Sequence, residues 1–319
     1  MLNNVFGIFG SIEFYGAIIR MTTPLLLAAI GGLVAEKAGL VTFSLEGMML
    51  MGTVGGVIGS GLTGNAWMGV LLAMVFGILM GLAYAVMAVS VGTHQIVTCV
   101  ALNMGAAGLS AVLFALVFAG GAGGVIEEVI QVEGLKLWKI PLLGDIPVIG
   151  PIFFNHYPLV YLAFLMVPVV WFLLYRTTWG LKVRAVGEHP HAADTVGINV
   201  IKVRYTTLMI AGALAGLAGA FLSVAALNNW EENMTSGRGF IAYTAIVFGK
   251  WEPVGVFLGT LLFGMADALQ LRMQTLNINI PYQFMVAFPY AVTLVALVLF
   301  VGKASWPAAS GSPFKREDK

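Results

Sequence analysis

The chain has 319 residues, of which 59% are hydrophobic and only 10% are Asp, Glu, Lys or Arg. A soluble domain has roughly 25% charged residues, and it cannot bury this much apolar side-chain area. The composition therefore excludes a water-soluble globule and a disordered chain, and the long apolar runs exclude an outer-membrane barrel of alternating strands. The net charge of +1 gives no basic surface for nucleic acid. At about 20 apolar residues per crossing, we expect an all-α polytopic membrane protein with roughly eight to ten transmembrane helices in contact with lipid.

Polar breaks divide the chain into apolar segments, and two of these differ from ordinary transmembrane helices. The segments lie at about 12–34, 40–59, 66–91, 93–119, 157–175, 205–227, 238–249, 254–271 and 284–301. The segment at 238–249 is too short to cross a hydrocarbon core of about 30 Å. The segment at 40–59 carries Glu46 and is interrupted by five glycines. Irregular backbone at membrane depth needs surrounding protein or a cavity, so we predict that both are broken or re-entrant helices facing a pathway.

Basic residues orient the chain across the membrane. The connection at 176–204 holds five Lys and Arg residues and the tail at 302–319 holds four, so both should be cytoplasmic. The stretch at 120–156 has four acidic against two basic residues and should be external, with Arg272 as an exception to the rule. No basic region precedes the first apolar run, so we expect no cleaved signal peptide.

The starts of the segments indicate an internal repeat. Segments one to four begin near 12, 40, 66 and 93, and segments six to nine follow the same order at an offset of about 190 residues. Five crossings separate the copies, so the second copy would be inverted, as in transporters whose site lies near the midplane. Loosely regular spacing also occurs in any helical bundle, which is the alternative. The predicted single transmembrane domain divides into repeat one at 12–119, an external stretch and helix at 120–175, a cytoplasmic loop at 176–204, repeat two at 205–301 and a cytoplasmic tail at 302–319.

A short helix is predicted within the cytoplasmic loop, between Pro190 and Gly197. Proline suits the first helical turn because its missing N–H needs no partner there, and glycine suits the position after the last turn. A helix this short is not stable alone and needs a surface to pack against. That surface could belong to a partner protein, whose basic groups would pair with Glu188 and Asp194. Alternatively, the helix is a connector that packs on the surface of the bundle itself.

Several motifs follow one another through most of the chain. They are TPLLLAAIGGLVAEKAG at 23–39, LEGMML at 45–50, Trp179-Gly180 continuing to RAVGE at 184–188, AADTVGI at 192–198, TSGRGFIA at 235–242, FGKW at 248–251 with Pro253, and Pro289-Tyr290. Together they resemble the permease subunits of bacterial ABC importers for nucleosides and simple sugars, which are related to ribose and branched-chain amino acid permeases. Tyr243-Thr244 departs from this pattern, where we expect smaller apolar residues, and this would reshape the pathway.

The resemblance implies a multi-pass subunit of the bacterial plasma (inner) membrane. It implies that the loop is a coupling helix that docks on a separate ATP-binding subunit, and that an extracytoplasmic substrate-binding (lipo)protein delivers the solute. It also implies a second permease subunit, either a related chain or another copy. The coupling residues on this basis are Arg184, Gly187, Glu188, Pro190, Ala192, Ala193, Asp194 and Gly197.

The sequence contains no motif that is typical of an enzyme active site. The Gly249-Lys250 pair lacks both the leading glycine and the following Ser or Thr of a phosphate-binding loop. No nucleophile–base set is visible, and His189 and His191 are only two residues apart with no Cys or third His nearby. We therefore expect no enzyme activity, metal or cofactor in this chain, and energy must come from a partner subunit or an ion gradient. The resemblance implies the partner subunit, which would hold ATP and Mg²⁺.

Polar residues within or beside apolar segments are the candidates for the pathway. They are Glu46, Asn103, Asn228, Trp230, Asn233, Thr235, Arg238, Phe240 and Asp267. Charges at this depth are costly, so Glu46, Arg238 and Asp267 either line the pathway or neutralise one another, for example Glu46 with Arg238. Asn103 either faces the solute or joins two helices, and the amides at 228–235 either contact the solute or form an ordinary external loop with an interfacial Trp.

Two functions remain from the sequence. The first is the permease of an ATP-driven importer for a nucleoside or simple sugar. The second is an ion-coupled secondary transporter of a small polar solute, in which Glu46 and Asp267 would bind the coupling ion.

Overall fold

The structure is a computed structural model that describes residues 11–118, 131–141, 144, 146, 147, 149–275, 283, 287–289, 291, 292, 295 and 306–314. Seven helices among these residues are long and apolar enough to cross a membrane. They are α2 (Ile12–Glu36), α3 (Leu45–Thr63), α4 (Ala66–Ala85) with a π-helical continuation (Val86–Val91), α5 (Gln95–Phe118), α7 (Pro158–Arg176), α10 (Val200–Ala220) with a π-helical continuation (Phe221–Ala226), and α12 (Pro253–Thr275). The expected all-α polytopic architecture is confirmed, and most of the predicted segment at 284–301 lies outside the described residues.

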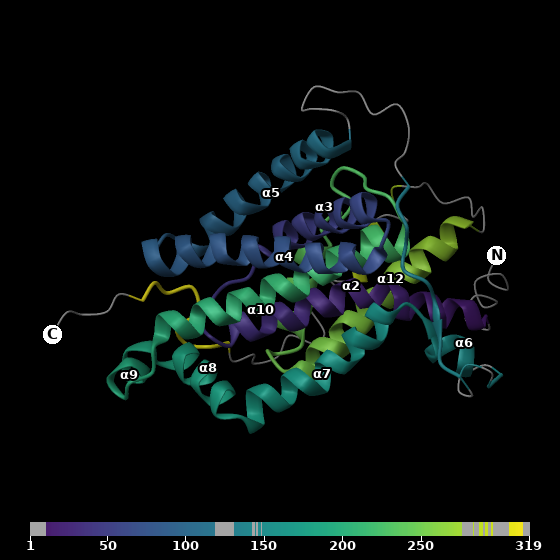
Figure 1. Cartoon of the computed structure of the whole chain (residues 1–319). Helices are drawn as coiled ribbons and strands as arrows, with labels where there is room; N and C mark the ends of the chain where they lie inside the picture. The colour runs from purple at the N-terminus through teal and green to yellow at the C-terminus, as the bar shows by residue number, and fades with distance from the viewer. Residues whose placement is uncertain are drawn as a thin grey trace.

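The shorter elements lie at the two ends of the bundle. At one end are α8 (Thr178–Glu188) and α9 (Pro190–Thr195), and at the other are α6 (Ile149–Phe153) and a two-stranded antiparallel sheet, β1 (Trp138–Lys139) with β2 (Asn155–His156). Figure 1 shows α8 and α9 beside the C-terminus and α6 beside the N-terminus. The loop expected in the cytoplasm and the stretch expected outside are therefore at opposite ends of the molecule.

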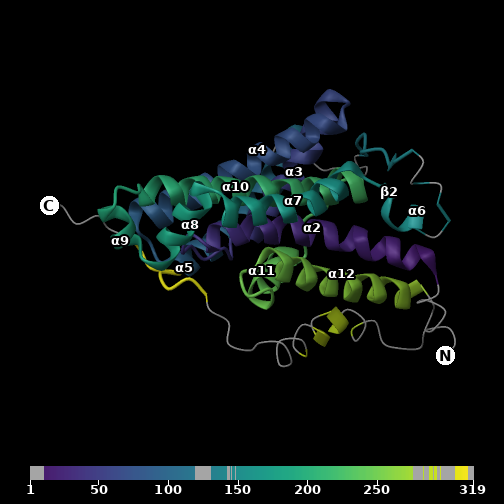
Figure 2. The ribbon, with the colours of Figure 1, turned by 90° about the horizontal axis from the view of Figure 1, so that it is seen from below.

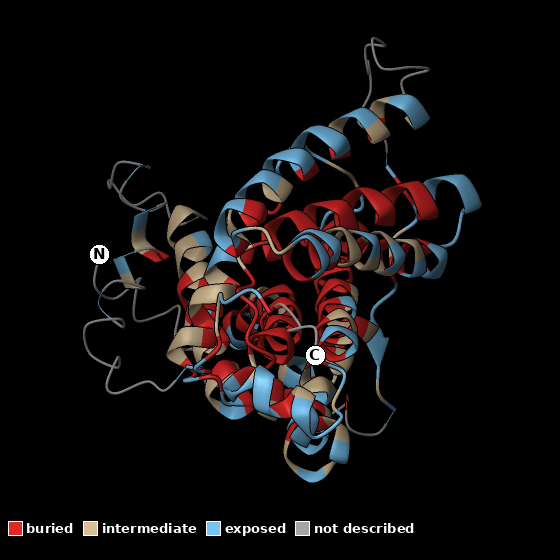
Figure 3. Ribbon diagram, turned by 90° about the vertical axis from the view of Figure 1, so that its left-hand side faces the viewer, coloured by how far each residue is buried: buried red, intermediate tan, exposed pale blue. Residues whose placement is uncertain are grey.

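Three helices form the buried centre. α2, α3 and α10 are buried along most of their length, whereas α5 is the least buried of the seven long helices described. Seen from the end that carries α9, buried residues occupy the middle and exposed residues the outer helix faces (Figure 3). Large apolar side chains such as Met104 and Leu258 remain exposed on the outer faces of α5 and α12, as expected for contact with lipid or another membrane subunit.

Glycines bring the central helices into close contact. A Cβ at Gly52 of α3 would lie 2.6 Å from the Cα of Gly216 in α10, and one at Gly59 would lie 2.8 Å from the Cα of Gly69 in α4. Without a hydrophobic driving force between helices in lipid, such small residues allow backbones to approach and gain van der Waals contact. The glycines of 40–59 therefore do not interrupt the helix. The prediction of a broken helix here is wrong, because α3 is continuous from Leu45 to Thr63.

The irregular backbone lies before two helices rather than inside them. Residues 37–44 precede α3 without forming a helix, and residues 227–237 precede α11 (Arg238–Phe248). α11 is short, as predicted, and it packs beside α12 on one side of α2 (Figure 2). Asn228, Asn233 and Ser236 in the second stretch have positive φ angles, which are uncommon for residues other than glycine.

A C-terminal segment at 306–314 packs at the end of the bundle that carries α8 and α9. Its Ala309 N–H donates to the carbonyl of Gly187 at 2.9 Å, and its Gly311 N–H donates to the carbonyl of Gly39 at 3.2 Å. The fully buried Arg204 of α10 donates from Nη1 to the carbonyl of Ser312 at 3.2 Å. The segment thus joins α8, α10 and the stretch that follows α2.

Candidate functional site

The carboxylate of Glu46 binds the N-terminus of α11. Glu46 lies in the first turn of α3 and is 4% exposed. Its Oε1 accepts hydrogen bonds from the Thr235 hydroxyl at 2.5 Å and the Gly237 N–H at 2.9 Å, and its Oε2 accepts one from the Gly239 N–H at 2.6 Å. The first N–H groups of a helix have no partner within it and favour a negative charge. The buried carboxylate is thereby compensated without a cation, and it joins α3 to α11.

The predicted ion pair between Glu46 and Arg238 is wrong. Arg238 instead donates from Nη1 to the carbonyls of Met234 and Thr235, each at 3.3 Å. With Asp267 of α12 it lines a cavity of about 160 Å³. Backbone N–H groups bind Glu46 where a guanidinium was expected. Glu46 thus caps a helix, whereas Arg238 and Asp267 line a small cavity.

Asn103 joins α5 to the start of α3. Its Nδ2 donates to the carbonyl of Phe43 at 2.9 Å, and its Oδ1 accepts from the Gly47 N–H at 2.8 Å. Both ends of the amide are therefore used in a helix–helix contact, which is the structural role weighed from the sequence. Beside this contact the ring of Phe43 stacks on Tyr243 of α11, and Phe240 is 42% exposed.

The amide-rich stretch before α11 contacts the segment at 131–137, which was expected to be external. The Val132 N–H donates to the carbonyl of Asn228 at 3.0 Å, and the indole of Trp230 stacks on Phe114 of α5 with ring centroids 4.4 Å apart. Asn228 and Asn233 are exposed, whereas Thr235 is fully buried against Glu46. The Trp230 indole N–H is buried without a hydrogen-bond partner among the described residues. The stretch is thus a fixed connection with two exposed amides.

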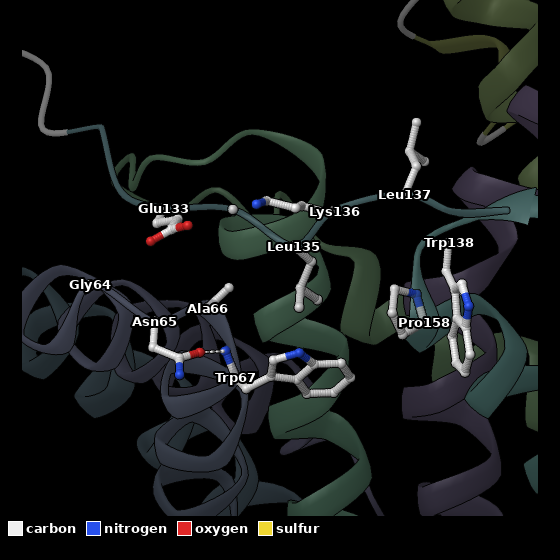
Figure 4. A pocket seen from close by; sticks show the side chains of 11 residues that line it. Gly64, Asn65, Ala66, Trp67, Glu133, Leu135, Lys136, Leu137, Trp138 and Pro158 are labelled. Atoms are coloured by element: carbon white, nitrogen blue, oxygen red, sulfur yellow. Dashed lines mark hydrogen bonds between the residues drawn. The ribbon is translucent and has the colours of Figure 1, made fainter.

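A pocket of about 620 Å³ lies beside β1, at the opposite end of the bundle from α9 (Figure 1). Figure 4 shows Trp67 from α4 and Trp138 from β1 on its wall, with the Leu135 side chain directed toward Trp67. Both indoles are exposed, and Asn65 caps α4 by accepting a hydrogen bond from the Trp67 N–H at 2.9 Å. Sequence reasoning missed this pocket because its walls come from segments more than 60 residues apart in the chain.

The coupling-loop residues surround the predicted short helix. α9 begins at Pro190, and Gly197 has a φ of +85° beyond its end, as expected. The Gly197 N–H donates to the Asp194 carbonyl at 3.0 Å, which closes the last turn. Ala193 is buried against the bundle, and Ala192 faces outward. Val196, the residue that follows α9, also faces outward and is 74% exposed.

The remaining loop residues hold α8 in place. A Cβ at Gly187 would lie 3.2 Å from the Gly39 backbone nitrogen, and the Glu188 carboxylate accepts from the Ala308 N–H at 3.4 Å. The Arg184 guanidinium lies over the Tyr175 ring, 5.1 Å from its centroid. Gly187 is buried and Arg184 is half-buried, whereas Glu188 is exposed, so only part of the predicted coupling set is accessible to a partner.

A second buried carboxylate was missed from the sequence. Glu36, at the end of α2, accepts from the Trp251 indole N–H at 2.6 Å through Oε2, and from the N–H and hydroxyl of Thr42, each at 3.0 Å, through Oε1. It therefore ties α2 to the turn after α11 and to the stretch before α3. Next to it, burial lowers the pKa of Lys37, and the charges of Glu252 and Glu188 oppose this shift. The signal was present in the AEKAG and FGKW motifs, but sequence spacing does not show that they touch.

The comparisons with known proteins cover nearly the whole chain. A family model described as branched-chain amino acid transport system / permease component matches residues 14–301. The chain is 39% identical to the guanosine ABC transporter permease protein NupQ of Bacillus subtilis (strain 168), covering 93% of this chain and 95% of the relative. It is 37% identical to the putative glucose ABC transporter permease protein TsgC13 of Haloferax volcanii, covering 88% and 89%.

A third relative is the nucleoside ABC transporter permease protein NupC of Lactococcus lactis subsp. cremoris, which is 36% identical and covers 91% of this chain and 92% of its own. No solved structure matches the chain. The resemblance seen in the motifs is confirmed by the family match and by these relatives. The chain belongs to the family of ABC transporter permease components typified by the branched-chain amino acid transport system, and it is a multi-pass membrane protein.

Proposed function

We propose that this chain is one of two membrane-spanning subunits of an ATP-driven importer for nucleosides in a bacterial plasma membrane. Two of the three relatives described above are named for guanosine or nucleoside transport, and the third is named for glucose. A simple sugar is therefore the second substrate class. ATP hydrolysis belongs to a partner subunit, and an extracytoplasmic binding protein supplies the solute at the external end.

The exposed outer face of α9 is the observation that supports the coupling role. Ala192, Thr195 and Val196 are exposed there, while Ala193 anchors the helix inward. A small, weakly polar surface on a short helix suits insertion into a groove of another protein, because few charges must be desolvated. We assign this groove to the ATP-binding subunit.

Hydrogen-bonded contacts connect α9 to the proposed pathway. α8 precedes α9 directly, and Gly187 of α8 packs on the backbone of residues 37–39. Glu36, next in the chain, holds both Thr42 and Trp251, which lie before α3 and after α11. A displacement of α9 is therefore passed to the start of α3 and to the C-terminal end of α11, the two helices that Glu46 joins, since packed elements transmit strain.

The pathway in this proposal runs along α5, the start of α3 and α11. Asn103, Phe240 and Tyr243 border this region, and the exposed outer face of α5 is assigned to the second permease subunit. The ion-coupled alternative is less well supported because Glu46 already accepts three hydrogen bonds from protein donors, which leaves little capacity for a coupling ion.

The test uses the complete importer in proteoliposomes, with the partner ATPase and the binding protein. We expect nucleoside uptake that requires ATP and withstands an ionophore. Ala192→Arg should abolish uptake and uncouple ATP hydrolysis, because it places a large charge on the docking face. Leu62→Arg, on an exposed site at the external end of α3, is the matched control. Uptake that continues after ATP depletion and stops when the ionophore is added would refute the proposal.

A further inference from the structure

We propose that Phe43 and Tyr243 form an aromatic constriction that selects for solutes carrying a planar base. This inference rests on the proposed function and names residues for its specificity. The two rings are stacked, with centroids 4.1 Å apart and an angle of 29° between their planes. Phe43 lies just before α3 and Tyr243 lies in α11, so the pair closes the space between two separate elements.

Hydrogen bonds on both sides fix the position of this pair. Asn103 of α5 holds the Phe43 carbonyl and the Gly47 N–H, which sets the backbone that carries the first ring. Glu46 holds the N-terminus of α11 through Gly237 and Gly239, which sets the helix that carries the second ring. Rings that are held from three elements form a preorganised contact, and a solute that meets it loses little binding energy to ordering the protein.

The pair borders an open surface of the chain. Both rings are half-buried, and Phe240 is 42% exposed one turn before Tyr243. Nothing in the described part of the chain forms a hydrogen bond with the Tyr243 hydroxyl. The pair therefore combines a flat aromatic face with a hydroxyl that no described residue binds, beside the exposed Phe240 of α11.

Stacking chemistry identifies the solute class. A purine or pyrimidine has an aromatic face and can replace one ring of the pair, with hydrogen-bonding groups at its edge for the Tyr243 hydroxyl. The stacking energy lost by the protein is regained with the solute, so a base can pass without being held tightly. A sugar ring has no aromatic face and does not compensate for separating the rings. The pair thus favours nucleosides over sugars.

The experiment measures uptake of guanosine and uridine by the complete importer in proteoliposomes, with the binding protein saturated by each. Tyr243→Leu removes the aromatic face, so we expect guanosine uptake to fall about tenfold. Uridine uptake should fall less, because its base offers a smaller face. Tyr243→Phe keeps the face and should retain most uptake of both nucleosides. Phe257→Leu, in the T-shaped Phe164–Phe257 contact between α7 and α12, is the matched control and should leave the guanosine-to-uridine ratio unchanged.

Equal losses for both nucleosides with Tyr243→Leu would indicate a packing role only and would overturn the inference, as would unchanged uptake. If Tyr243→Leu does not assemble, Phe43→Leu provides the same comparison from the other ring. Absence of nucleoside uptake by the unmodified importer contradicts the proposed function instead, so the two failures are distinguishable.

Discussion

Replacing Glu46 by Gln tests how α3 and α11 are joined. The carboxylate accepts three hydrogen bonds from Thr235, Gly237 and Gly239 in a buried setting. Gln retains one carbonyl oxygen, but it loses the negative charge at the helix N-terminus and turns an N–H₂ group toward a donor. A hydrogen bond to a charged group contributes about 1.5–3 kcal/mol, and the helix dipole adds roughly 0.3–1 kcal/mol. We expect Glu46→Gln to destabilise the docking of α11 by about 2–4 kcal/mol.

Two measurements check this magnitude. Thermal unfolding in detergent should occur at a lower temperature in Glu46→Gln, and amide hydrogen exchange should accelerate at Gly237 and Gly239. Glu133→Gln, at an exposed external carboxylate, is the control and should change neither quantity. Unchanged exchange at the two glycines would refute the cap. Exchanging the charges of Glu46 and Arg238 gives an independent check, because the double reversal should not restore stability if no ion pair joins them.

Three other predictions follow from the cytoplasmic and external ends. Gly187→Val should uncouple ATP hydrolysis from uptake, since its side chain would collide with the Lys37 carbonyl carbon, 3.0 Å from the added Cβ; normal coupling in transport assays would contradict this. Trp251→Phe removes the N–H that donates to Glu36 and should lower the free energy of unfolding in detergent by about 1–3 kcal/mol. An unchanged free energy of unfolding would show that this hydrogen bond does not stabilise the contact between α2 and the turn after α11. Burial lowers the pKa of His156 from its ordinary 6.5, so its neutral form is favoured in the fold. Its stabilising contribution is complete above pH 6.5 and is lost as the pH falls, and His156→Gln should flatten this part of the melting-temperature profile; an unaltered profile would contradict it.

Much of the fold was predictable because lipid imposes length and apolarity on each crossing. The first segment, expected at 12–34, is the helix Ile12–Glu36, and the fifth, expected at 157–175, is Pro158–Arg176. The short helix after Pro190 was predictable for a local reason, since proline and glycine restrict or free the backbone wherever they occur.

The contacts of the candidate site were less predictable, because they depend on backbone groups that every residue carries. Glu46 was identified as a buried charge, but its partners are two glycine N–H groups and a hydroxyl rather than the cation expected. The glycines of α3 were interpreted as breaks although they are contact points, and only the position of Gly216 on another helix distinguishes these roles. Tyr243 stood out as unusual, and its stacking partner Phe43 did not.

The C-terminal segment has a consequence for biosynthesis. The ribosome makes residues 306–314 after every other described element, yet the guanidinium of Arg204 in α10 depends on the Ser312 carbonyl for one of its two hydrogen bonds. Before that segment is synthesised, the helices of the nascent chain are already inserted. At that stage Arg204 lacks the Ser312 carbonyl as an acceptor, and the Gly187 carbonyl lacks the Ala309 N–H as a donor. The surface that carries α9 therefore forms last. A prematurely terminated chain reaches the membrane with that surface incomplete, and we expect it to be cleaved by proteases more readily than the full chain.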